Sequence, residues 1–566
     1  MSDKQKVLVI GIDGATFDLI GPWIREGHLP NLGRMMKKGT SGELQSTPLS
    51  NSAQAWSSFI TGKNPGKHGI YDFYEPRSDS YGVRFINASY RKGKSLWKLL
   101  SEAGRKAGVI NVPITYPPET VNGFIIPGLD SPGMGPDFVY PPGLMEELTE
   151  HVGQYILEPG IWGNIRQGKP DLALQNLLKM VKARTAAATY LMTHKEWDLF
   201  MVVYTASDKV QHHFWKYIDP DRPESKVKTA YSDAIFQVYV EIDRGIGEMI
   251  KQAGDASVIV MSDHGAGPST RKTMYINRWL SAEGFLTFKD VHKSAGGFGH
   301  FKYLLVDRTN NWLKKMLPRG VKERLLRLFP RLRDRVESML FLPGIEWKKT
   351  AAYSRENHPA IYINTNGREI DGTVSPGEDY NKVRNRIIER LKALRCPDTG
   401  EPIAGRIYTR EELFNGPDSM RAPDIIFEWN KYQYVHRPSG RGNNKDFLEI
   451  LKDDDLLKSE NYNRPSGIHR DYGIFAGSGK NLGKTRTVEN INIYDIAPTI
   501  LYLLGVPVPE DMDGRIIEDA IDDDYLKQNS LEKISSSVSD GQYQHVFDAD
   551  EAKVIEDRLK GLGYID

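Results

Sequence analysis

Residues that could bind a metal ion follow an apolar stretch near the middle of the sequence. Ser257 to Gly265 reads Ser-Val-Ile-Val-Met-Ser-Asp-His-Gly, so a β-branched run stops at Asp263 and His264. Such a run is typical of a buried strand, and open α/β sheets carry their chemistry at the carboxyl ends of strands. Taken alone, the pair favours a structural aspartate–histidine hydrogen bond beside a glycine turn. Its meaning therefore depends on the partners that the rest of the chain supplies.

The amino-terminal stretch repeats this design. The segment Val7 to Ile12 is mostly apolar, Asp13 follows it, and Gly14 lets the backbone turn sharply beside the carboxylate. The dinucleotide-binding pattern G-x-G-x-x-G is absent at this position. A metal ligand is the interpretation that this pattern favours for Asp13.

A second pair of ligand-type residues follows the strand-like run Leu199 to Tyr204. Asp208 and His212 are four residues apart, so a helix that begins near Asp208 would bring both side chains to one face, as metal chelation requires. His213 would then point elsewhere. A solvated helix pair explains the same spacing equally well. Further along, His469 lies in a predicted loop. A lone loop histidine is informative only when it completes a set of metal ligands.

A candidate nucleophile stands at the start of a short predicted helix. Ser52 precedes the segment Ala53 to Thr61, and Gly62 ends that segment. A hydroxyl in this place is most often a helix cap. It can also be a nucleophile, because the amino terminus of a helix favours negative charge on an alkoxide and on a bound phosphate. His68, in the following turn, is more often structural than catalytic.

The elements that must position these residues alternate between helices and strands. The segment Leu96 to Leu100 is amphipathic, and Ala107 to Val112 is strand-like. Alternation of this kind predicts the α/β class, with a mainly parallel central sheet flanked by crossover helices. The proline- and glycine-rich segment Pro117 to Pro142 is predicted to be a long loop that lines a cleft or runs over the surface.

Taken together and in this order, these segments resemble the alkaline phosphatase superfamily. Within it, the chain is most similar to the type I phosphodiesterase and nucleotide pyrophosphatase branch, which has an alkaline phosphatase-like fold. The resemblance extends from residue 7 to about residue 515. It is carried by Gly11-Ile12-Asp13-Gly14, Ser52 to Gly62, His68-Gly69-Ile70, Asp208-x-x-x-His212, Ser262-Asp263-His264-Gly265, His469 and the closing segment Ile491 to Gly514.

The resemblance implies a metal-dependent phosphoric ester hydrolase, and a phosphodiesterase in particular. It implies two divalent metal ions, one held by Asp208, His212 and His469, the other by Asp13, Asp263, His264 and the oxygen of Ser52. Mixed carboxylate and imidazole ligands suit zinc, with manganese as the alternative. Ser52 would attack phosphorus and form a covalent phosphoryl-enzyme, activated by the ion beside it.

Two positions depart from the pattern of this branch. Ser52 stands where threonine is common, and an asparagine that helps bind phosphate in nucleotide pyrophosphatases would fall near Asp72 or Phe73. Serine preserves the nucleophilic oxygen, whereas the missing asparagine puts nucleotide substrates in doubt. The sulfatase branch is disfavoured, because the residues after Ser52 lack its modification signal. The expected partner is a phosphate-ester small molecule, with a nucleotide or a lipid-linked compound as the two alternatives.

Two other functions stay open. A phosphomonoesterase or phosphomutase on the same core would need an extra positive clamp near the nucleophile, for which Lys63, Lys67, Arg91 and Lys92 are the candidates. A non-enzymatic protein that binds metal or phosphate is the third alternative. Comparing the hydrolysis of diesters with that of monoesters would separate the first two functions.

Composition narrows the class of protein. The 566 residues carry a formal net charge of +1, so the overall balance gives no reason to expect a nucleic-acid partner. The single cysteine, Cys396, cannot form an internal disulfide, and a strand-like run begins almost at once, at Val7. These features predict a cytoplasmic protein without a cleaved signal peptide. No apolar run approaches the roughly 20 residues that cross a bilayer.

The predicted organisation has four parts. Residues 1–296 form the first part of the catalytic core, 297–432 an insertion, 433–518 the last part of the core, and 519–566 a linker with a C-terminal helix from Ala552 to Leu562. The insertion combines a basic helical segment with an α+β cap that contains a helix from Tyr380 to Leu394. From Lys314 to Arg335 there are nine basic and two acidic residues. This segment is either an amphipathic hairpin packed on the body or a contact with an anionic membrane or lipid-linked substrate.

Overall fold

A computed structural model describes residues 5–77, 79–289, 342, 344–438, 446–456, 464–483, 485–535 and 545–562 of the chain. Its centre is a nine-stranded sheet with the order β19-β2-β18-β8-β1-β7-β5-β6, in which β20 also pairs with β2. Among these described strands, β18 runs antiparallel to both of its neighbours and the other pairings are parallel. The strands are β1 (Val7–Ile12), β2 (Thr40–Gln45), β5 (Ala107–Ile110), β6 (Gly123–Ile126), β7 (Leu199–Tyr204), β8 (Ser257–Met261), β18 (Tyr472–Ser478), β19 (Arg486–Thr487) and β20 (Ile491–Asn492).

The middle strands are apolar because both of their faces are covered. In β1, Leu8, Ile10 and Ile12 pack into one hydrophobic cluster, whereas Val7 and Val9 pack into another on the opposite face. Successive side chains of a strand point to opposite faces, so one uninterrupted apolar run serves two cores. The prediction of an α/β fold with a mainly parallel central sheet is confirmed.

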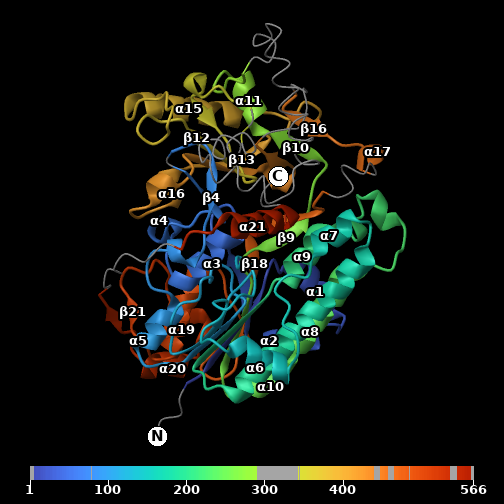
Figure 1. Cartoon of the computed structure of the whole chain (residues 1–566), viewed down its shortest axis with the longest axis vertical. Helices are drawn as coiled ribbons and strands as arrows, with labels where there is room; N and C mark the ends of the chain where they lie inside the picture. The colour runs from blue at the N-terminus through green and yellow to red at the C-terminus, as the bar shows by residue number, and fades with distance from the viewer. Residues whose placement is uncertain are drawn as a thin grey trace.

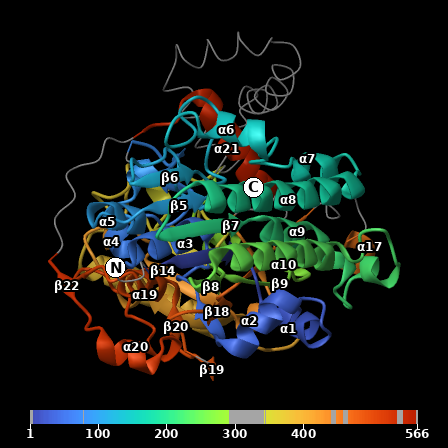
Figure 2. The same cartoon turned by 90° about the horizontal axis from the view of Figure 1, so that it is seen from below.

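Two sets of helices cover these faces (Figures 1 and 2). The first cluster contains residues of α1 (Phe17–Arg25), α2 (Pro30–Lys38), α6 (Leu144–His151), α7 (Ile161–Arg166), α8 (Pro170–His194), α9 (Ala206–Phe214) and α10 (Ala234–Ala253). The second contains residues of α3 (Ser52–Thr61), α5 (Leu96–Glu102) and α19 (Ile496–Leu503). Among the described helices, none has an apolar stretch long enough to cross a membrane.

A separate cap lies over one end of the sheet, at the top of Figure 1. It contains one sheet with the order β11-β12-β14-β13 and another with the order β15-β10-β16. Its elements are β10 (Lys272–Tyr275), α11 (Ile276–Ala282), β11 (Ala352–Tyr353), β12 (Ala360–Ile363), α15 (Glu378–Ala393), β13 (Ala404–Thr409), α16 (Arg410–Leu413), β14 (Ile425–Trp429), β15 (Val435–Arg437) and β16 (Leu448–Ile450). Most of these elements share one hydrophobic core, which includes Trp279 and Leu280 of α11.

The domain boundaries stay predictions, because much of the region in question, including the basic segment Lys314 to Arg335, lies outside the described residues. The helix predicted from Tyr380 to Leu394 corresponds to α15, which runs from Glu378 to Ala393. The segment Pro117 to Pro142 differs, since it contains β6, the edge strand paired with β5. Four residues flanked by proline and glycine are too short a signal to identify a strand.

The C-terminal helix α21 (Ala549–Leu562) packs back onto the core beside α7 and the hairpin of β3 (Tyr74–Pro76) and β4 (Val83–Phe85). Ile555 and Leu559 join a small hydrophobic cluster with Ala53, the residue after Ser52. Arg558 donates to the carbonyl oxygens of Leu129 and Ser131. The last described helix therefore supports the region around the start of α3. The remaining elements are α4 (Pro65–His68), α17 (Asp453–Leu456), α20 (Asp523–Gln528), β9 (Gly265–Pro268), β17 (Gly467–Arg470), β21 (Val508–Pro509) and β22 (Lys533–Ile534).

Candidate active site

Three adjacent strands deliver five of the predicted site residues. β1 lies between β7 and β8 in the sheet, and all three run in parallel. Their carboxyl ends therefore meet at one edge, where open α/β sheets place their ligands. Asp13 follows β1, Asp263 and His264 follow β8, and α9, which carries Asp208 and His212, begins after β7.

The turn after Asp13 depends on glycine. Gly14 has a φ of 69°, in the left-handed region. A Cβ atom on this residue would lie 3.2 Å from Asp208 Oδ1. The backbone N–H of Gly14 donates to Asp263 Oδ1 at 3.2 Å, which fixes one carboxylate relative to the other strand. Glycine thus allows the two strand ends to approach closely.

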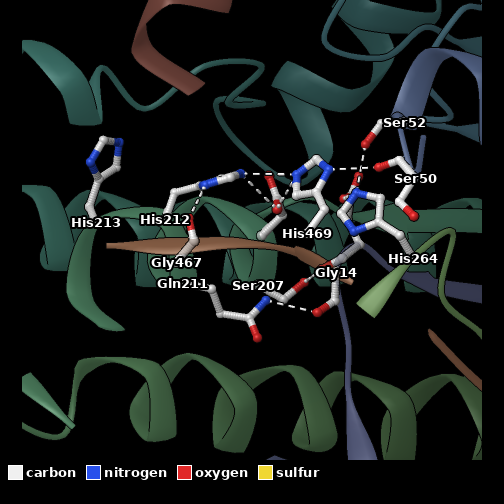
Figure 3. A network of polar contacts seen from close by, with 12 residues as sticks. Gly14, Ser50, Ser52, Ser207, Gln211, His212, His213, His264, Gly467 and His469 are labelled. Carbon is white, nitrogen blue, oxygen red and sulfur yellow. Dashed lines mark hydrogen bonds and ion pairs between the residues drawn. The ribbon is translucent and has the colours of Figure 1, made fainter. Parts of the chain in front are cut away.

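The first cluster consists of Asp208, His212 and His469. Asp208 Oδ1 lies 3.1 Å from His212 Nε2 and 3.5 Å from His469 Nε2, and the two ring nitrogens are 3.1 Å apart. The helical spacing of four residues brings Asp208 and His212 together, as predicted. His213 points away from this cluster (Figure 3), and its Nε2 lies 3.0 Å from the carbonyl oxygen of Gly561 in α21.

The second cluster surrounds Ser52. Ser52 Oγ lies 2.9 Å from His264 Nε2, and that ring nitrogen is 3.3 Å from Asp263 Oδ2 and 3.7 Å from Asp13 Oδ1. Side-chain atoms of Asp13, Asp208 and His264 all lie within 4.8 Å of one another, so Asp208 is near both clusters. The structure therefore brings all seven predicted residues together, and their roles as metal ligands stay predictions.

The three histidines share one hydrogen-bonding arrangement. The Nδ1 atoms of His212, His264 and His469 lie 2.9, 2.9 and 2.7 Å from the backbone carbonyl oxygens of Gly467, Gly265 and Ser50. A carbonyl oxygen can only accept, so each Nδ1 carries a proton, and in a neutral ring Nε2 then carries a lone pair. All three Nε2 atoms face carboxylates, which are also acceptors. Apart from the Ser52 hydroxyl, the groups that converge here are lone-pair donors that suit a cation, and backbone-anchored imidazoles are typical of metal ligands.

The buried carboxylates point to the same requirement. Burial, together with the charges of Asp263 and Asp208, raises the pKa of Asp13 well above its ordinary value. Burial and the charge of Asp208 raise the pKa of Asp263 to about 6. Asp13 Oδ1 and Asp263 Oδ2 are buried and lack a hydrogen-bond partner among the described residues. The donor set therefore fits divalent cations, which would supply the missing positive charge.

Burial and neighbouring charges also shift the pKa values of the three histidines. Burial, together with the charge of His264, lowers the pKa of His469 to about 4, and burial lowers the pKa of His264. Both rings are therefore neutral at neutral pH. Burial opposes a charge on His212 as well, but attraction to Asp208 prevails and raises its pKa. The cluster thus favours positive charge near the Nε2 atom of His212.

A strained turn presents Ser52 to the clusters. Leu49 and Ser50 both have positive φ values, 76° and 47°, which side chains of L-residues rarely adopt. The carbonyl oxygen of Ser50 accepts the hydrogen bond from His469. Asn51 then caps α3, because its Oδ1 accepts from Ala53 N at 2.9 Å. Ser52, at the first position of α3, is thereby relieved of the capping role and can serve as a nucleophile.

Two histidines lie in settings that the sequence did not predict. His469 lies in strand β17, paired with β9, and not in a loop. His358 comes from the cap segment between β11 and β12, and its Nε2 lies 3.1 Å from Asn51 Nδ2. A lone histidine in the middle of the cap carried no signal for this contact. His68 is structural, as expected, because its ring nitrogens bond to Ser58 Oγ and the N–H of Ile70.

The four basic candidates for a phosphate clamp all have carboxylate partners. Lys63 pairs with Asp511, Lys67 with Asp513 at 2.7 Å, Arg91 with Glu119 at 3.0 Å and Lys92 with Asp418 at 2.7 Å. Their charges are therefore largely neutralised by groups outside the two clusters.

Solved structures of a phosphonoacetate hydrolase have a similar fold. Two structures of phosphonoacetate hydrolase from Sinorhizobium meliloti 1021, in complex with phosphonoformate and with phosphonoacetate, have TM-scores of 0.53 and 0.52 at 14% and 15% sequence identity. Each match covers 89% of this chain and 96% of that chain. Inactive murine ectonucleotide pyrophosphatase/phosphodiesterase 5 in complex with AMP has a TM-score of 0.45 at 14% identity, over 89% of this chain and 95% of that one. No curated protein sequence matches the chain.

The family model for type I phosphodiesterases and nucleotide pyrophosphatases matches residues 7–447. This range includes Asp13, Ser52, Asp208, and the Asp263 and His264 pair, and it ends before His469. The last ligand candidate therefore depends on the structure, where β17 brings it beside His212. The chain belongs to the type I phosphodiesterase/nucleotide pyrophosphatase family and is a hydrolase that acts on phosphoester bonds.

Proposed function

We propose that the protein is a phosphodiesterase that uses Ser52 as its nucleophile beside two divalent metal ions. The observation that carries the proposal is the convergence of three backbone-anchored imidazole nitrogens on buried carboxylates around the Ser52 hydroxyl. Asp208, His212 and His469 would hold one ion, and Asp13, Asp263, His264 and Ser52 the other. Zinc suits this donor set, with manganese as the alternative. When bound, the ions would lower the pKa of the serine hydroxyl and offset negative charge on the phosphoryl oxygens.

The residues of the chain would carry the reaction in two steps. Ser52 Oγ would attack phosphorus, the P–O bond to one alcohol would break, and the alcohol would leave with a proton. Water would then attack the phosphoserine ester and release the remaining monoester, which restores Ser52. Ser52 is the first residue of α3, where the positive end of the helix dipole favours the negative charge of the phosphoryl group.

The neutralised basic residues favour a diester over a monoester. A monoester dianion carries one more charge than a diester and benefits from an added cationic clamp. Lys63, Lys67 and Lys92 are held by carboxylates. With these pairs in place, the two metal ions would be the main positive charge for the substrate, which suits the monoanionic diester.

The test compares bis(p-nitrophenyl) phosphate with p-nitrophenyl phosphate in metal-loaded protein. We expect a higher kcat/KM for the diester, and a loss on the order of 10⁴-fold or more in Ser52→Ala, as for other removed nucleophiles. Ser57→Ala is the matched control, because Ser57 is buried in the same helix and its Oγ has no hydrogen-bond partner among the described residues. Faster hydrolysis of the monoester would favour a phosphomonoesterase. Equal inertness of the wild-type protein and Ser52→Ala would instead favour a binding protein.

A further inference from the structure

A second group of carboxylates lies where the cap meets the core, close to the nucleophile. Asn51, the residue before Ser52, donates its side-chain amide to Asp72 Oδ1 at 2.9 Å. The same amide lies beside His358, and Glu356 belongs to the same cap segment as His358. Asp72 is therefore one hydrogen bond away from the residue that caps the nucleophile's helix.

Each of these carboxylates has one oxygen without a partner. Asp72 is 3% exposed and Glu356 is 5% exposed. Asp72 Oδ1 accepts from Asn51 and from the N–H of Phe73, and Glu356 Oε1 accepts from the Tyr362 hydroxyl. Asp72 Oδ2 and Glu356 Oε2 are buried and have no hydrogen-bond partner among the described residues. Buried polar atoms in folded proteins are nearly always paired, so these two oxygens indicate a missing donor.

The two carboxylates line one small cavity. Its volume is about 20 Å³, which is room for a group the size of one water molecule. The rings of Tyr71, Tyr74 and Tyr362 form part of its wall. The Tyr74 hydroxyl is in hydrogen-bonding reach of the Asp72 side chain, and burial, together with the charge of Asp72, raises the pKa of Tyr74.

Negative charge is in excess around this cavity. Its charged lining comprises the acidic residues Asp72, Glu75 and Glu356 and the basic residue Arg421. Arg421 already pairs with Glu75 and Asp418, and Arg84 also pairs with Glu75. Arg355, which attracts Glu356, lies over the Tyr362 ring at 4.3 Å and pairs with Glu369 at 3.8 Å. Asp72 and Glu356 are therefore the acidic groups of the lining whose negative charge is least compensated.

The titration of Asp72 agrees with this geometry. Burial and the charge of Glu356 raise the pKa of Asp72 to about 8. Burial also raises the pKa of Glu356. Both shifts have the direction expected where two buried carboxylates lack a nearby cation.

We propose that this cavity binds a primary ammonium group carried by one alcohol arm of the substrate, a proposal that rests on the phosphodiesterase function given above. An ammonium group has three N–H donors and no acceptor, so it would pair with both Asp72 Oδ2 and Glu356 Oε2. The tyrosine rings would add cation–π attraction. A trimethylammonium group has no N–H donor and is too large for the cavity, so the site selects primary amines.

The test measures binding to the metal-loaded Ser52→Ala protein by isothermal titration calorimetry. The probes are methyl 2-aminoethyl phosphate, methyl n-propyl phosphate and methyl 2-(trimethylammonio)ethyl phosphate at pH 7. We expect the aminoethyl ester to bind at least tenfold more tightly than the isosteric propyl ester, with no such gain for the trimethylammonio ester. Adding Glu356→Gln should bring the ratio of the first two affinities close to one.

Glu389→Gln is the matched control, because Glu389 is exposed on helix α15 of the cap, and it should keep the tenfold ratio. Equal binding of the aminoethyl and propyl esters, as expected if the cavity holds water or a shared proton, would overturn the proposal. So would an unchanged ratio in Glu356→Gln. Hydrolysis of the same esters by the wild-type protein is measured separately. If no ester is cleaved while the binding preference persists, the proposed function fails and the ammonium site stands.

Discussion

Two groups of buried carboxylates lie near the start of α3, and their neighbours differ. Asp13, Asp208 and Asp263 face imidazole nitrogens that add further lone pairs. Asp72 and Glu356 face a cavity lined by tyrosine rings. The first set of acceptors suits a metal ion, which several lone pairs can coordinate at once. The second suits an organic cation that brings its own N–H donors and a surface for ring contact. The neighbours of a carboxylate therefore indicate which cation it binds.

The largest difference in metal content and activity is expected between substitutions of the adjacent residues His212 and His213. His212→Ala removes a ring nitrogen from the first cluster, and we expect loss of one metal ion and a fall in kcat/KM of about 100-fold or more. His213→Ala should keep both ions, since His213 contacts the carbonyl of Gly561 instead, and should lower the free energy of unfolding by about 1 kcal/mol. Metal content by mass spectrometry and urea denaturation measure the two effects. Equal loss of metal from both variants would contradict the assignment of the first cluster.

Metal removal should destabilise the core without affecting the ammonium cavity. A ligand that binds only the folded state stabilises it by about 2.7 kcal/mol at 100 times its Kd. We therefore expect EDTA to lower the Tm and added zinc to restore it. Glu356→Gln should show the same drop as the wild-type protein, because Glu356 belongs to the other group. A Tm that is indifferent to EDTA and zinc would argue against metal at the strand ends.

Asp72 should make stability depend on pH. Its pKa is raised to about 8 from an ordinary 3.8, so the folded state keeps a proton that the unfolded chain releases between these values. The contribution of Asp72 to stability therefore falls as pH rises from about 4 to about 8. Asp72→Asn cannot ionise, so it should gain stability relative to the wild-type protein across this window. Urea denaturation at pH 5 and pH 8 measures the difference, and an identical difference at both pH values would refute the prediction.

His358 should have the smallest effect. Its removal breaks the contact between the cap and Asn51, and a neutral hydrogen bond contributes about 1 kcal/mol. We expect His358→Ala to lower kcat/KM roughly fivefold for the diester while metal content stays the same. Loss of metal from this variant would show that His358 supports the clusters and not only the helix cap.

Local sequence signals sufficed for the residues at strand ends. Asp13 and Asp263 each follow an apolar run, and Asp208 and His212 have helical spacing, so short-range rules could predict their setting. The strand that carries His469 could not be predicted this way. β17 forms by pairing with β9, about 200 residues earlier in the chain, and such pairing depends on tertiary context.

Contacts between distant parts of the chain near the nucleophile could not be predicted for a related reason. The direction of Lys63 and Lys67 depends on carboxylates that lie more than 400 residues later in the chain. The approach of Glu356 to Asp72 depends on how the whole cap seats on the core. No periodicity within a single segment records such contacts.

The ribbon of β9 and β17 has a consequence for how the cap could vary. Its register pairs His469 with Ala266 and Arg470 with Gly265, directly after His264. Every described cap element lies between these two strands in the chain, so β9 and β17 connect the cap to the core. A different cap could connect the two strands without moving His264 or His469, provided that the register of β9 and β17 is kept. Residues between the two strands can therefore change without altering the pairing that holds His469 beside the segment after His264.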